Sequence, residues 1–546
     1  MRRLFLQLLL FVPAIASAQL DTTARAIDRV FDAWRDTEGP GCAVGVSRNG
    51  KSVYERGYGM ANLETGTPIR AASIFHVASV SKQFTAASIM LLAHDGRLSV
   101  DDNIRKYLPE MPDYGTPITI RHLLTHTSGL RDQWALLALA RGRFEENRIT
   151  EADVMDIVPR QTALNFKPGA EYVYSNTGFT LLGVIVKRVS GQSLKDFAAE
   201  RIFTPLGMTS THFHDDYTML VPGRTSAYER RDDGRGWRVG IPNFDTYGAT
   251  SLFTTVGDLL KWEANFENPI AGDADMFAQM QRVTPLTNGD TSSYGFGVIS
   301  GEYRGAKVVE HAGADAGYRS YVGRFPALGV GIAIACNAST ANTTALARGV
   351  ADAVLAGSLQ AASPTRIPAA VTLSSDALTR RTGVYVQPTT MQVVELSMRN
   401  GTLIAGRQTG PFVTPVADDR FIVAGQPGEL VFASGEHAGF ERRVGTTHPV
   451  PFEWRQPVTL TKATLASYAG TYRSDELAGA TYRVTAKDST LEFVTGTSQP
   501  FSARPIFTNA FIGNGYTIQF TDAKGRVSGF EVTDGRMRRV RFARMP

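Results

Sequence analysis

Hydrophobic and polar positions alternate near the start of the chain, in two runs between Cys42 and Tyr58 that are joined by Asn49 and Gly50. Alternation puts every second side chain on one face of a strand, and Asn-Gly is the strongest short turn signal. This segment therefore predicts a β-hairpin.

From Ser79 to about Phe266 the pattern becomes helical. The clearest series has helical spacing: Val80, Phe84, Ala87 and Leu91. Strand-like runs return further on: Tyr294–Ser300, Lys307–His311, Ser320–Phe325 and Val330–Cys336, followed by an expected helix at 344–355. Strands at both ends with helices between them predict one sheet built from both ends of a domain, with a helical region inserted.

The final part of the chain contains an internal repeat. The segment 378–385, LTRRTGVY, matches 465–472, LASYAGTY, and three later matches keep nearly the same offset: Phe421 with Phe511, Phe432 with Phe520, and Phe440 with Phe530. All runs here are short, alternating and separated by turn residues, so each copy has the size and pattern of a small antiparallel β-barrel. We expect its interior to be filled by its own side chains.

A chain of 546 residues is longer than the ~250 to 300 residues that one hydrophobic core supports. The Ala-, Ser- and Pro-rich stretch 356–370 has no periodicity and predicts a linker. We expect these boundaries: a leader at 1–18, a mixed helix-and-sheet domain at 19–358, a linker at 359–373, and barrels at 374–455 and 456–546. Each domain should hold its own core.

The leader has the pattern of a secretory signal: Arg2 and Arg3, an apolar run, and small residues before a cleavage site after Ala18. The run is too short to span a bilayer and none like it follows, so we expect a periplasmic or secreted protein without a permanent membrane anchor. A formal net charge of +5 without Lys/Arg blocks argues against nucleic acid as a partner. The sequence does not indicate an oligomeric state.

The chain has two cysteines, Cys42 and Cys336, and both lie in strand-like runs. The interpretation that we favour is that both are buried small hydrophobic residues. If the two runs pair antiparallel, however, an oxidising compartment would permit a disulfide. Two cysteines so far apart in the sequence do not form a metal site.

The strongest chemical signal is the motif Ser79-Val80-Ser81-Lys82 at an expected helix start. Residues i and i+3 share a helix face, so the Lys82 amine would lie beside the Ser79 hydroxyl. A desolvated lysine can be neutral enough to remove the serine proton, and a helix N-terminus offers N–H groups to a developing oxyanion.

Two further motifs follow in order. The first is Tyr174-Ser175-Asn176, in which a phenol near an ammonium would lose its proton more readily and an amide could orient Lys82. The second is His311-Ala312-Gly313 at the end of a strand, where small residues would let a substrate backbone lie along the edge.

In this order, S-x-x-K, Y-x-N and a basic residue followed by x-Gly resemble the active site of the serine β-lactamase-like or S12 peptidase family. Its members include class C β-lactamases, D-alanyl-D-alanine carboxypeptidases, and esterase and peptidase relatives. The segments FHVASVSKQFTAASIMLL, ITIRHLLTHTSGL and SLFTTVGDLLKW are also similar, and the resemblance covers about 39–355. It implies an α+β fold, an antiparallel sheet with helices on both sides and a helical subdomain, here followed by the two barrels.

The resemblance also implies roles for individual residues. Ser79 would be the nucleophile, and Lys82 and Tyr174 would share the base and acid roles. Four residues would contact the substrate: Asn176, which orients it, His311, Gly313 and Ala314. The oxyanion hole would consist of the backbone N–H groups of Ser79 and Ala314, and no metal or cofactor is expected.

Two departures from the family pattern matter for function. The third motif is usually Lys-Thr-Gly or Lys-Ser-Gly and here begins with His311, and no separate glutamate is recognisable for water activation, so Tyr174 would have to activate the deacylating water. A histidine there, with two barrels, resembles the D-aminopeptidase branch and related secreted peptidases, one of which acts on linearised microcystin.

We therefore expect a serine peptidase or amidase that acts, through an acyl-enzyme, on small peptides or amides with D- or otherwise unusual residues. The alternative is a carboxylesterase, or a weak β-lactamase or penicillin-binding protein, with the same site. A penicillin-acylated sensor fits less well, because such sensors need a membrane-spanning segment and none is expected after the leader. An inactive scaffold fits less well because the catalytic set is intact.

Two histidine pairs have the spacing of metal ligands: His212 and His214, which precede two aspartates on an expected polar loop, and His122 and His126, for which no third ligand is apparent. We interpret His212 and His214 as solvated surface residues. His122 and His126 are interpreted as parts of a structural turn near the active site.

Overall fold

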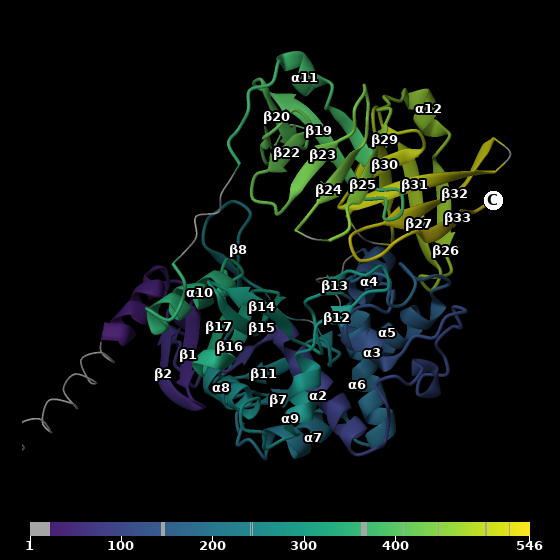
Figure 1. The fold of residues 1–546 in the computed structure, drawn as a ribbon. Coiled ribbons are helices and arrows are strands. Elements are labelled where there is room, and N and C mark those ends of the chain that lie inside the picture. The colour runs from purple at the N-terminus through teal and green to yellow at the C-terminus, as the bar shows by residue number, and fades with distance from the viewer. Residues whose placement is uncertain are drawn as a thin grey trace, which may run out of the picture.

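The structure, a computed structural model, describes residues 22–142, 148–240, 242, 244–361, 368–407, 409–445, 447–496, 499–523 and 525–546. The expected leader and the centre of the expected linker lie outside these ranges. Figure 1 shows the hydrolase-like domain below and two β-structures above it. In the described ranges, no helix combines the length and the apolar character that crossing a membrane requires.

A six-stranded antiparallel sheet of order β14-β15-β16-β17-β1-β2 lies at the centre of the first domain (Figure 1). Its strands are β1 Cys42–Arg48, β2 Lys51–Tyr58, β14 Ile299–Tyr303, β15 Ala306–Asp315, β16 Tyr318–Phe325 and β17 Val330–Cys336. The predicted hairpin and the assembly of one sheet from both ends of the domain are confirmed. The strand predicted from Tyr294 is wrong in extent, because β14 begins at Ile299 and the Tyr294 side chain is buried, with its hydroxyl hydrogen-bonded to His311.

Successive residues of the sheet face two different cores. Val44 and Val46 of β1 pack in a core with Ala347 and Val350 of α10, Thr343–Val354. The alternate positions of the sheet face a second core that contains α8, Val256–Asn265. Helices therefore cover both faces of the sheet, as the family resemblance implied.

The helical subdomain surrounds α2, which is buried along most of its length and contacts α6 extensively. The helices of this part of the domain are α2 Ser81–His94, α3 Ile120–Leu124, α4 Gln133–Arg141, α5 Glu151–Ile157, α6 Asn176–Ser190, α7 Leu194–Ala198 and α9 Ala274–Met280. The short strands are β3 Met60–Asn62, β4 Thr67–Pro68, β5 Phe75–His76, β6 Ile149–Thr150, β7 His212–Phe213, β8 Tyr228–Arg230, β9 Trp237–Val239, β10 Phe244–Asp245, β11 Leu252–Thr254, β12 Thr284–Pro285 and β13 Thr291–Ser292.

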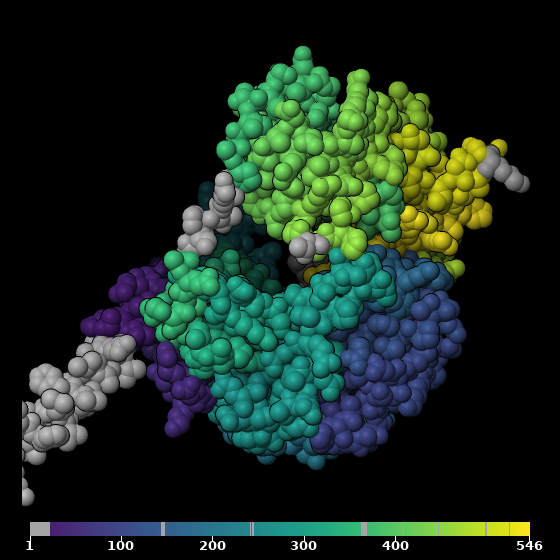
Figure 2. Space-filling model, viewed as in Figure 1, coloured from purple at the N-terminus to yellow at the C-terminus, as the bar shows by residue number. Residues whose placement is uncertain are grey.

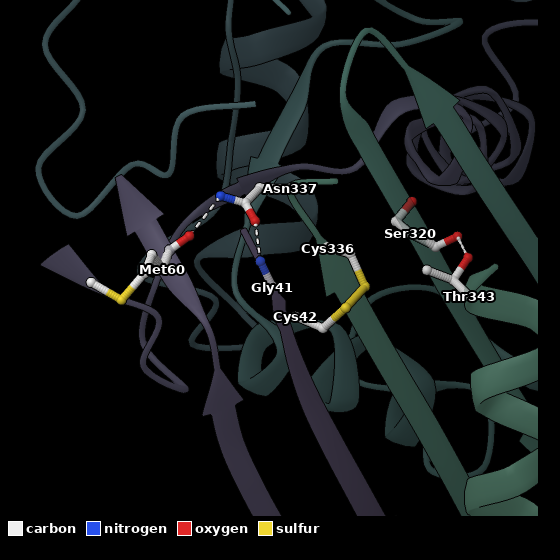
Figure 3. The surroundings of a disulfide bond; sticks show 7 residues. All are labelled: Gly41, Cys42, Met60, Ser320, Cys336, Asn337 and Thr343. Atoms are coloured by element: carbon white, nitrogen blue, oxygen red, sulfur yellow. Dashed lines mark hydrogen bonds between the residues drawn. A yellow bond between two sulfur atoms is a disulfide. The ribbon is translucent and has the colours of Figure 1, made fainter. Parts of the chain in front are cut away.

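Cys42 and Cys336 form a disulfide between β1 and β17 (Figure 3). The two residues are directly opposite each other in the antiparallel pairing, which brings their side chains to the same face. Beside them, the Asn337 amide accepts a hydrogen bond from the Gly41 N–H at 2.8 Å and donates one to the Met60 carbonyl at 3.0 Å. The interpretation of two unpaired hydrophobic residues was wrong, because only the strand register, not the sequence pattern, places the two sulfurs together.

The C-terminal region contains two eight-stranded antiparallel sheets, one a closed barrel and the other nearly closed. The first follows α11 Ser375–Thr379 and comprises β18 Gly383–Val386, β19 Val393–Arg399, β20 Thr402–Ala405, β21 Val413–Pro415, β22 Arg420–Val423, β23 Glu429–Phe432, β24 Phe440–Arg443 and β25 Val450–Arg455. The second follows α12 Lys462–Ala466 and comprises β26 Gly470–Ser474, β27 Ala480–Ala486, β28 Leu491–Val494, β29 Phe501–Phe507, β30 Ala510–Gly513, β31 Tyr516–Ala523, β32 Arg526–Thr533 and β33 Val540–Arg544. Two small antiparallel barrels are therefore confirmed.

The matched residues of the repeat occupy equivalent strands. Tyr385 lies on the first strand of its barrel and Tyr472 on the first strand of the other, and each hydroxyl donates to the carbonyl four residues earlier. The three matched phenylalanine pairs lie on the fifth, sixth and seventh strands and are all buried. Each barrel is thus filled by its own aromatic side chains, as predicted.

The core of the second barrel is continuous with that of the helical subdomain. Its buried residues, such as Leu477 and Tyr482, belong to the same hydrophobic cluster as Leu137 of α4, and the Tyr482 hydroxyl donates to the Leu139 carbonyl at 2.8 Å. The expectation that each domain holds a separate core is therefore wrong for this barrel. A fragment without it would expose apolar surface of the helical subdomain.

The first barrel contacts the hydrolase domain more lightly. His448, in the connection between β24 and β25, pairs with Asp290 at 2.8 Å on the surface. Its side chain is 63% exposed, so this pair contributes little to stability. Figure 2 shows a hollow between the first barrel and the hydrolase domain.

A buried ion pair joins the second barrel to the helical subdomain. The Arg131 guanidinium lies 2.8 Å from the Glu476 carboxylate, with side chains 1% and 7% exposed. Burial alone would raise the pKa of Glu476, but the charge of Arg131 and hydrogen bonds from Thr162 outweigh it and hold the pKa below its ordinary value. The carboxylate therefore stabilises the folded state at neutral pH.

We predict that Glu476→Gln lowers the free energy of unfolding by roughly 3 kcal/mol at pH 7, because it leaves a buried guanidinium without its counter-ion. Since the folded-state pKa of Glu476 is lowered, the difference from the unmodified protein should shrink as the pH falls through that pKa. Denaturant unfolding measures both effects. Glu531→Gln, which breaks an exposed pair with Arg541, is the control, and an equal effect of the two substitutions would contradict the prediction.

Candidate active site

Ser79 lies in a short 3₁₀ turn, Ala78–Val80, directly before α2. The preceding Ala78 has φ of 47°, a left-handed conformation that costs energy in a residue with a side chain. Ser81 holds the turn, since its hydroxyl donates to the Ala78 carbonyl and accepts from the Leu252 N–H. The predicted helix start is confirmed, and the strained turn points the Ser79 hydroxyl into a pocket.

The Lys82 amine is fully buried and has three close oxygen neighbours. Nζ lies 3.1 Å from Ser79 Oγ, 2.9 Å from Asn176 Oδ1 and 2.6 Å from the Ala249 carbonyl. Burial lowers its pKa well below the ordinary value, and the charge of Arg536 lowers it further, against the opposing effects of Asp132 and Asp315. The predicted neutral lysine therefore matches the environment of this site.

The neutral amine fits this geometry. Asn176 Oδ1 and the Ala249 carbonyl can only accept hydrogen bonds, so they take the two N–H groups of Lys82. The lone pair is left facing the Ser79 hydroxyl. Lys82 is thus arranged to receive the proton of Ser79.

Asp132 fixes the orientation of Asn176. One oxygen of its carboxylate accepts from both the backbone N–H and the side-chain amide of Asn176, at 2.7 and 2.9 Å. The amide oxygen must then point at Lys82, as predicted for Asn176. Asp132 itself was not predicted, because its only sequence signal is that of an N-cap for α4.

Tyr174 lies against the same amine, with Lys82 Nζ 4.9 Å from the centre of its ring. Burial raises the pKa of Tyr174, although the neighbouring Ser79 hydroxyl opposes the shift. Within the described ranges, the buried hydroxyl completes no hydrogen bond. The expectation that this phenol loses its proton readily does not fit this environment, because burial disfavours the phenolate more than the nearby charge of Arg536 favours it.

His311 is neutral and engaged at both ring nitrogens. Nδ1 lies 2.6 Å from the Ala312 carbonyl, which can only accept, so Nδ1 carries the proton and Nε2 accepts from the Tyr294 hydroxyl at 2.9 Å. Burial lowers the pKa of His311 to about 3. Sequence reasoning missed Tyr294, whose apolar alternation with Phe296 and Val298 has the pattern of a strand.

A pocket of about 540 Å³ brings most of the predicted residues together. It is lined by six of them: Ser79, Tyr174, Asn176, His311, Gly313 and Ala314. Lys82 is buried just behind Ser79. Other lining residues that the sequence did not indicate include Trp134, Thr250, Asp315, Arg319 and Arg536.

Strand β15 forms one wall of this pocket. Its pairing with β14 ends at Glu310, so residues 311–315 have a free edge on that side, along which a substrate backbone could lie. Gly313 is required for a different reason than predicted. A Cβ atom there would lie 2.3 Å from the Val77 carbonyl, so glycine lets the strand pack directly against the turn that carries Ser79.

The histidines with ligand spacing have structural positions. His126 accepts from the Ser175 N–H at 3.2 Å and its ring packs beside Tyr174, which agrees with a structural turn near the site. His212 and His214 are not solvated as predicted. They lie on and next to β7, which pairs with β11, and the His214 ring is buried against Phe253.

The family described as Beta-lactamase matches residues 27–356, more than half of the chain. The chain belongs to the β-lactamase family. The predicted resemblance is therefore confirmed, and the β-lactamase-family domain holds every residue of the pocket wall named so far except Arg536.

Curated relatives match this domain at low identity. The D-aminopeptidase of Brucella anthropi is 29% identical over 282 residues, 52% of this chain and 53% of that protein. Penicillin-binding protein 4* of Bacillus subtilis is 30% identical over 297 residues, 51% of this chain and 64% of that protein. The chain thus spans about half the length of the D-aminopeptidases that it matches.

Solved structures show the same fold. An octameric penicillin-binding protein homologue from Pyrococcus abyssi has a TM-score of 0.56 at 20% identity, over 87% of this chain and 99% of that one. D-amino acid amidase from Ochrobactrum anthropi SV3 has a TM-score of 0.52 at 22% identity, over 61% of this chain and 98% of that one. The α+β class with a sheet between helices is confirmed.

We predict that a serine-directed covalent inhibitor labels Ser79 and that Ser79→Ala lowers kcat by at least ~10³-fold, because the activated nucleophile is removed. Peptide mapping by mass spectrometry identifies the labelled residue. Ser175→Ala is the control, because this buried hydroxyl has no hydrogen-bond partner in the described residues and should be dispensable. Labelling at another serine would refute the assignment.

We also predict that Asp132→Asn lowers kcat by roughly 10- to 100-fold, because Asn176 is no longer held toward Lys82. The negative charge of Asp132 raises the pKa of Lys82, so its removal should move the acid limb of the pH–rate profile to lower pH. Asp132→Glu keeps the charge and should leave the acid limb in place. An acid limb that does not move in Asp132→Asn would show that Lys82 is not the titrating base.

Proposed function

We propose that the protein is a serine peptidase or amidase that acts through an acyl-enzyme on peptides with D- or otherwise unusual residues. The observation that carries the proposal is the Lys82 amine, whose lone pair is left free for the Ser79 hydroxyl. Support for the substrate class comes from relatives named D-aminopeptidase and a structural neighbour named D-amino acid amidase.

The first half of the reaction forms an ester. Neutral Lys82 takes the proton of Ser79, whose oxygen attacks the substrate carbonyl and forms a tetrahedral oxyanion. The N–H groups of Ser79 and Ala314 are the proposed donors to that oxyanion, and the close packing of Gly313 against the Ser79 turn supports this pairing.

The leaving amine needs a proton, and Tyr174 is the proposed donor. Its raised pKa keeps the phenol protonated until the C–N bond breaks. Protonated Lys82 then returns a proton to the tyrosine oxygen. This sequence restores both groups and leaves the acyl group on Ser79.

Hydrolysis of the ester reverses the roles. Because Tyr174 holds its proton tightly, Lys82 is the better base for the deacylating water, either directly or through the tyrosine oxygen. This revises the expectation that Tyr174 alone activates the water.

The alternative functions, a carboxylesterase or a weak β-lactamase, use the same nucleophile. His311 disfavours a β-lactamase. It is neutral, buried and hydrogen-bonded at both nitrogens, so it offers no permanent positive charge to a carboxylate held rigidly beside β15. Peptides that end in an amide have no C-terminal carboxylate, so the missing positive charge does not weaken their binding.

We also propose a periplasmic or extracellular location. The secretory pattern of residues 1–18 supports it. The Cys42–Cys336 disulfide supports it independently, because structural disulfides persist mainly in oxidising compartments.

A hydrolysis screen of D- and L-aminoacyl amides, short peptides, p-nitrophenyl esters and nitrocefin tests the proposal. We predict that a peptide or amide is hydrolysed faster than nitrocefin. His311→Lys, which adds a charge to the β15 wall, should raise the ratio of carboxylate-bearing to neutral substrates by about tenfold, whereas the neutral His311→Gln should not. Nitrocefin turnover above that of every peptide and ester would favour the β-lactamase instead.

A further inference from the structure

Arg536 brings a positive charge from the second barrel to the active site. It lies in the connection between β32 and β33, yet it lines the same pocket as Ser79 and Asn176. Its guanidinium carbon is 5.2 Å from the centre of the Tyr174 ring. The active-site pocket is therefore not formed by the β-lactamase-family domain alone.

The backbone at Arg536 is fixed from both sides. Its carbonyl accepts from the Asp132 N–H at 3.2 Å and from the Asn165 amide at 2.9 Å, both in the hydrolase domain. Within the connection, the Asp534 carboxylate accepts from the N–H groups of Arg536 and Met537, each at 2.7 Å. The position of Arg536 relative to the pocket is thus set by four hydrogen bonds that involve residues of two domains.

Arg538, two residues further on, is an arginine with a structural role. Arg538 is 9% exposed at its side chain and pairs with Glu171 at 2.8 Å. Arg536, in contrast, is exposed, and among the described residues its guanidinium has no ion pair or hydrogen bond. Structural docking of the barrel therefore uses Arg538, and the charge of Arg536 is left available.

Arg319 is the other arginine that lines the pocket, but the negative charge of Asp315, which also lines the pocket, lies close enough to raise its pKa against the effect of burial. Its guanidinium donates to the Ala316 and Tyr318 carbonyls at 2.8 and 2.7 Å. A carboxylate entering the pocket thus finds a free cation in Arg536, and charge-assisted guanidinium–carboxylate pairs are strong because both N–H groups can donate.

We propose that Arg536 binds a carboxylate on the leaving-group side of the substrate, so that the enzyme prefers peptides with an acidic group just after the bond that it cleaves. This deepens the proposed function and rests on it. The side follows from Tyr174, because the residue that protonates the leaving group faces it, and Arg536 lies over that ring. His311 is 3% exposed, whereas Arg536 is exposed to solvent. Arg536 is therefore placed to bind a carboxylate on a flexible part of the substrate, not one held deep beside β15.

Two sources could supply this carboxylate: an Asp or Glu side chain, or the C-terminus of the released residue. D-Ala-L-Glu-NH2 compared with D-Ala-L-Gln-NH2 tests the first, and D-Ala-L-Ala compared with its C-terminal amide tests the second. We expect at least one acidic substrate to exceed its neutral partner in kcat/KM by about tenfold, and Arg536→Gln to abolish that preference.

The matched control is Arg541→Gln, an arginine of the same barrel on the exposed face of β33, which should keep the preference. Arg536→Glu should reverse it and favour D-Ala-L-Lys-NH2. Thermal unfolding of each variant verifies that the barrel stays docked.

If no peptide is cleaved, the proposed function fails, but Arg536 is still tested by 3-acetoxybenzoate against 3-acetoxybenzamide, two esters whose leaving phenols differ in charge. A ratio between these esters that falls by about tenfold in Arg536→Gln would support the anion site. Equal acid-to-neutral ratios in the unmodified enzyme and Arg536→Gln, for both peptides and esters, would overturn the inference.

Discussion

The burial of one amine determines the chemistry of this protein. The Lys82 side chain is fully buried, and among the residues that the structure describes it forms no ion pair with a carboxylate. The charged form is therefore disfavoured, and the neutral form is held by two acceptors, Asn176 and the Ala249 carbonyl. The contacts of the neighbouring residues maintain this arrangement. Asp132 hydrogen-bonds to Asn176 and not to Lys82 itself. Its carboxylate therefore orients the Asn176 amide without pairing directly with the Lys82 amine.

The same arrangement connects the second barrel to the residues around Lys82. Asp132 receives the Asn176 amide through its carboxylate and donates its N–H to the Arg536 carbonyl. A single residue thus lies between the base and the barrel. Because the barrel and the helical subdomain share a hydrophobic core and the buried Arg131–Glu476 pair, displacement of the barrel would disturb the residue that orients the base.

Local patterns predicted what lies close in sequence. Ser79 and Lys82 are one helical turn apart, and the hairpin and the barrel repeat have their own periods, so sequence alone placed them. Asp132 and Arg536 have no such pattern, because they meet the site only when distant segments pack together. Tyr294 was assigned to a strand because it alternates with Phe296 and Val298. Residues buried beside an active site and residues buried in a sheet can show the same alternation of apolar and polar positions. The pKa of a buried phenol likewise depends on neighbours from several elements.

The two barrels contact the hydrolase domain through equivalent connections. In both, the connection between the seventh and eighth strands touches the hydrolase domain, through His448 in the first and Arg536 in the second. The consequence for stability differs between the two copies. Loss of the exposed His448–Asp290 pair would remove one surface contact of the first barrel, whereas a change at Arg536 would reach the backbone of Asp132 beside the nucleophile.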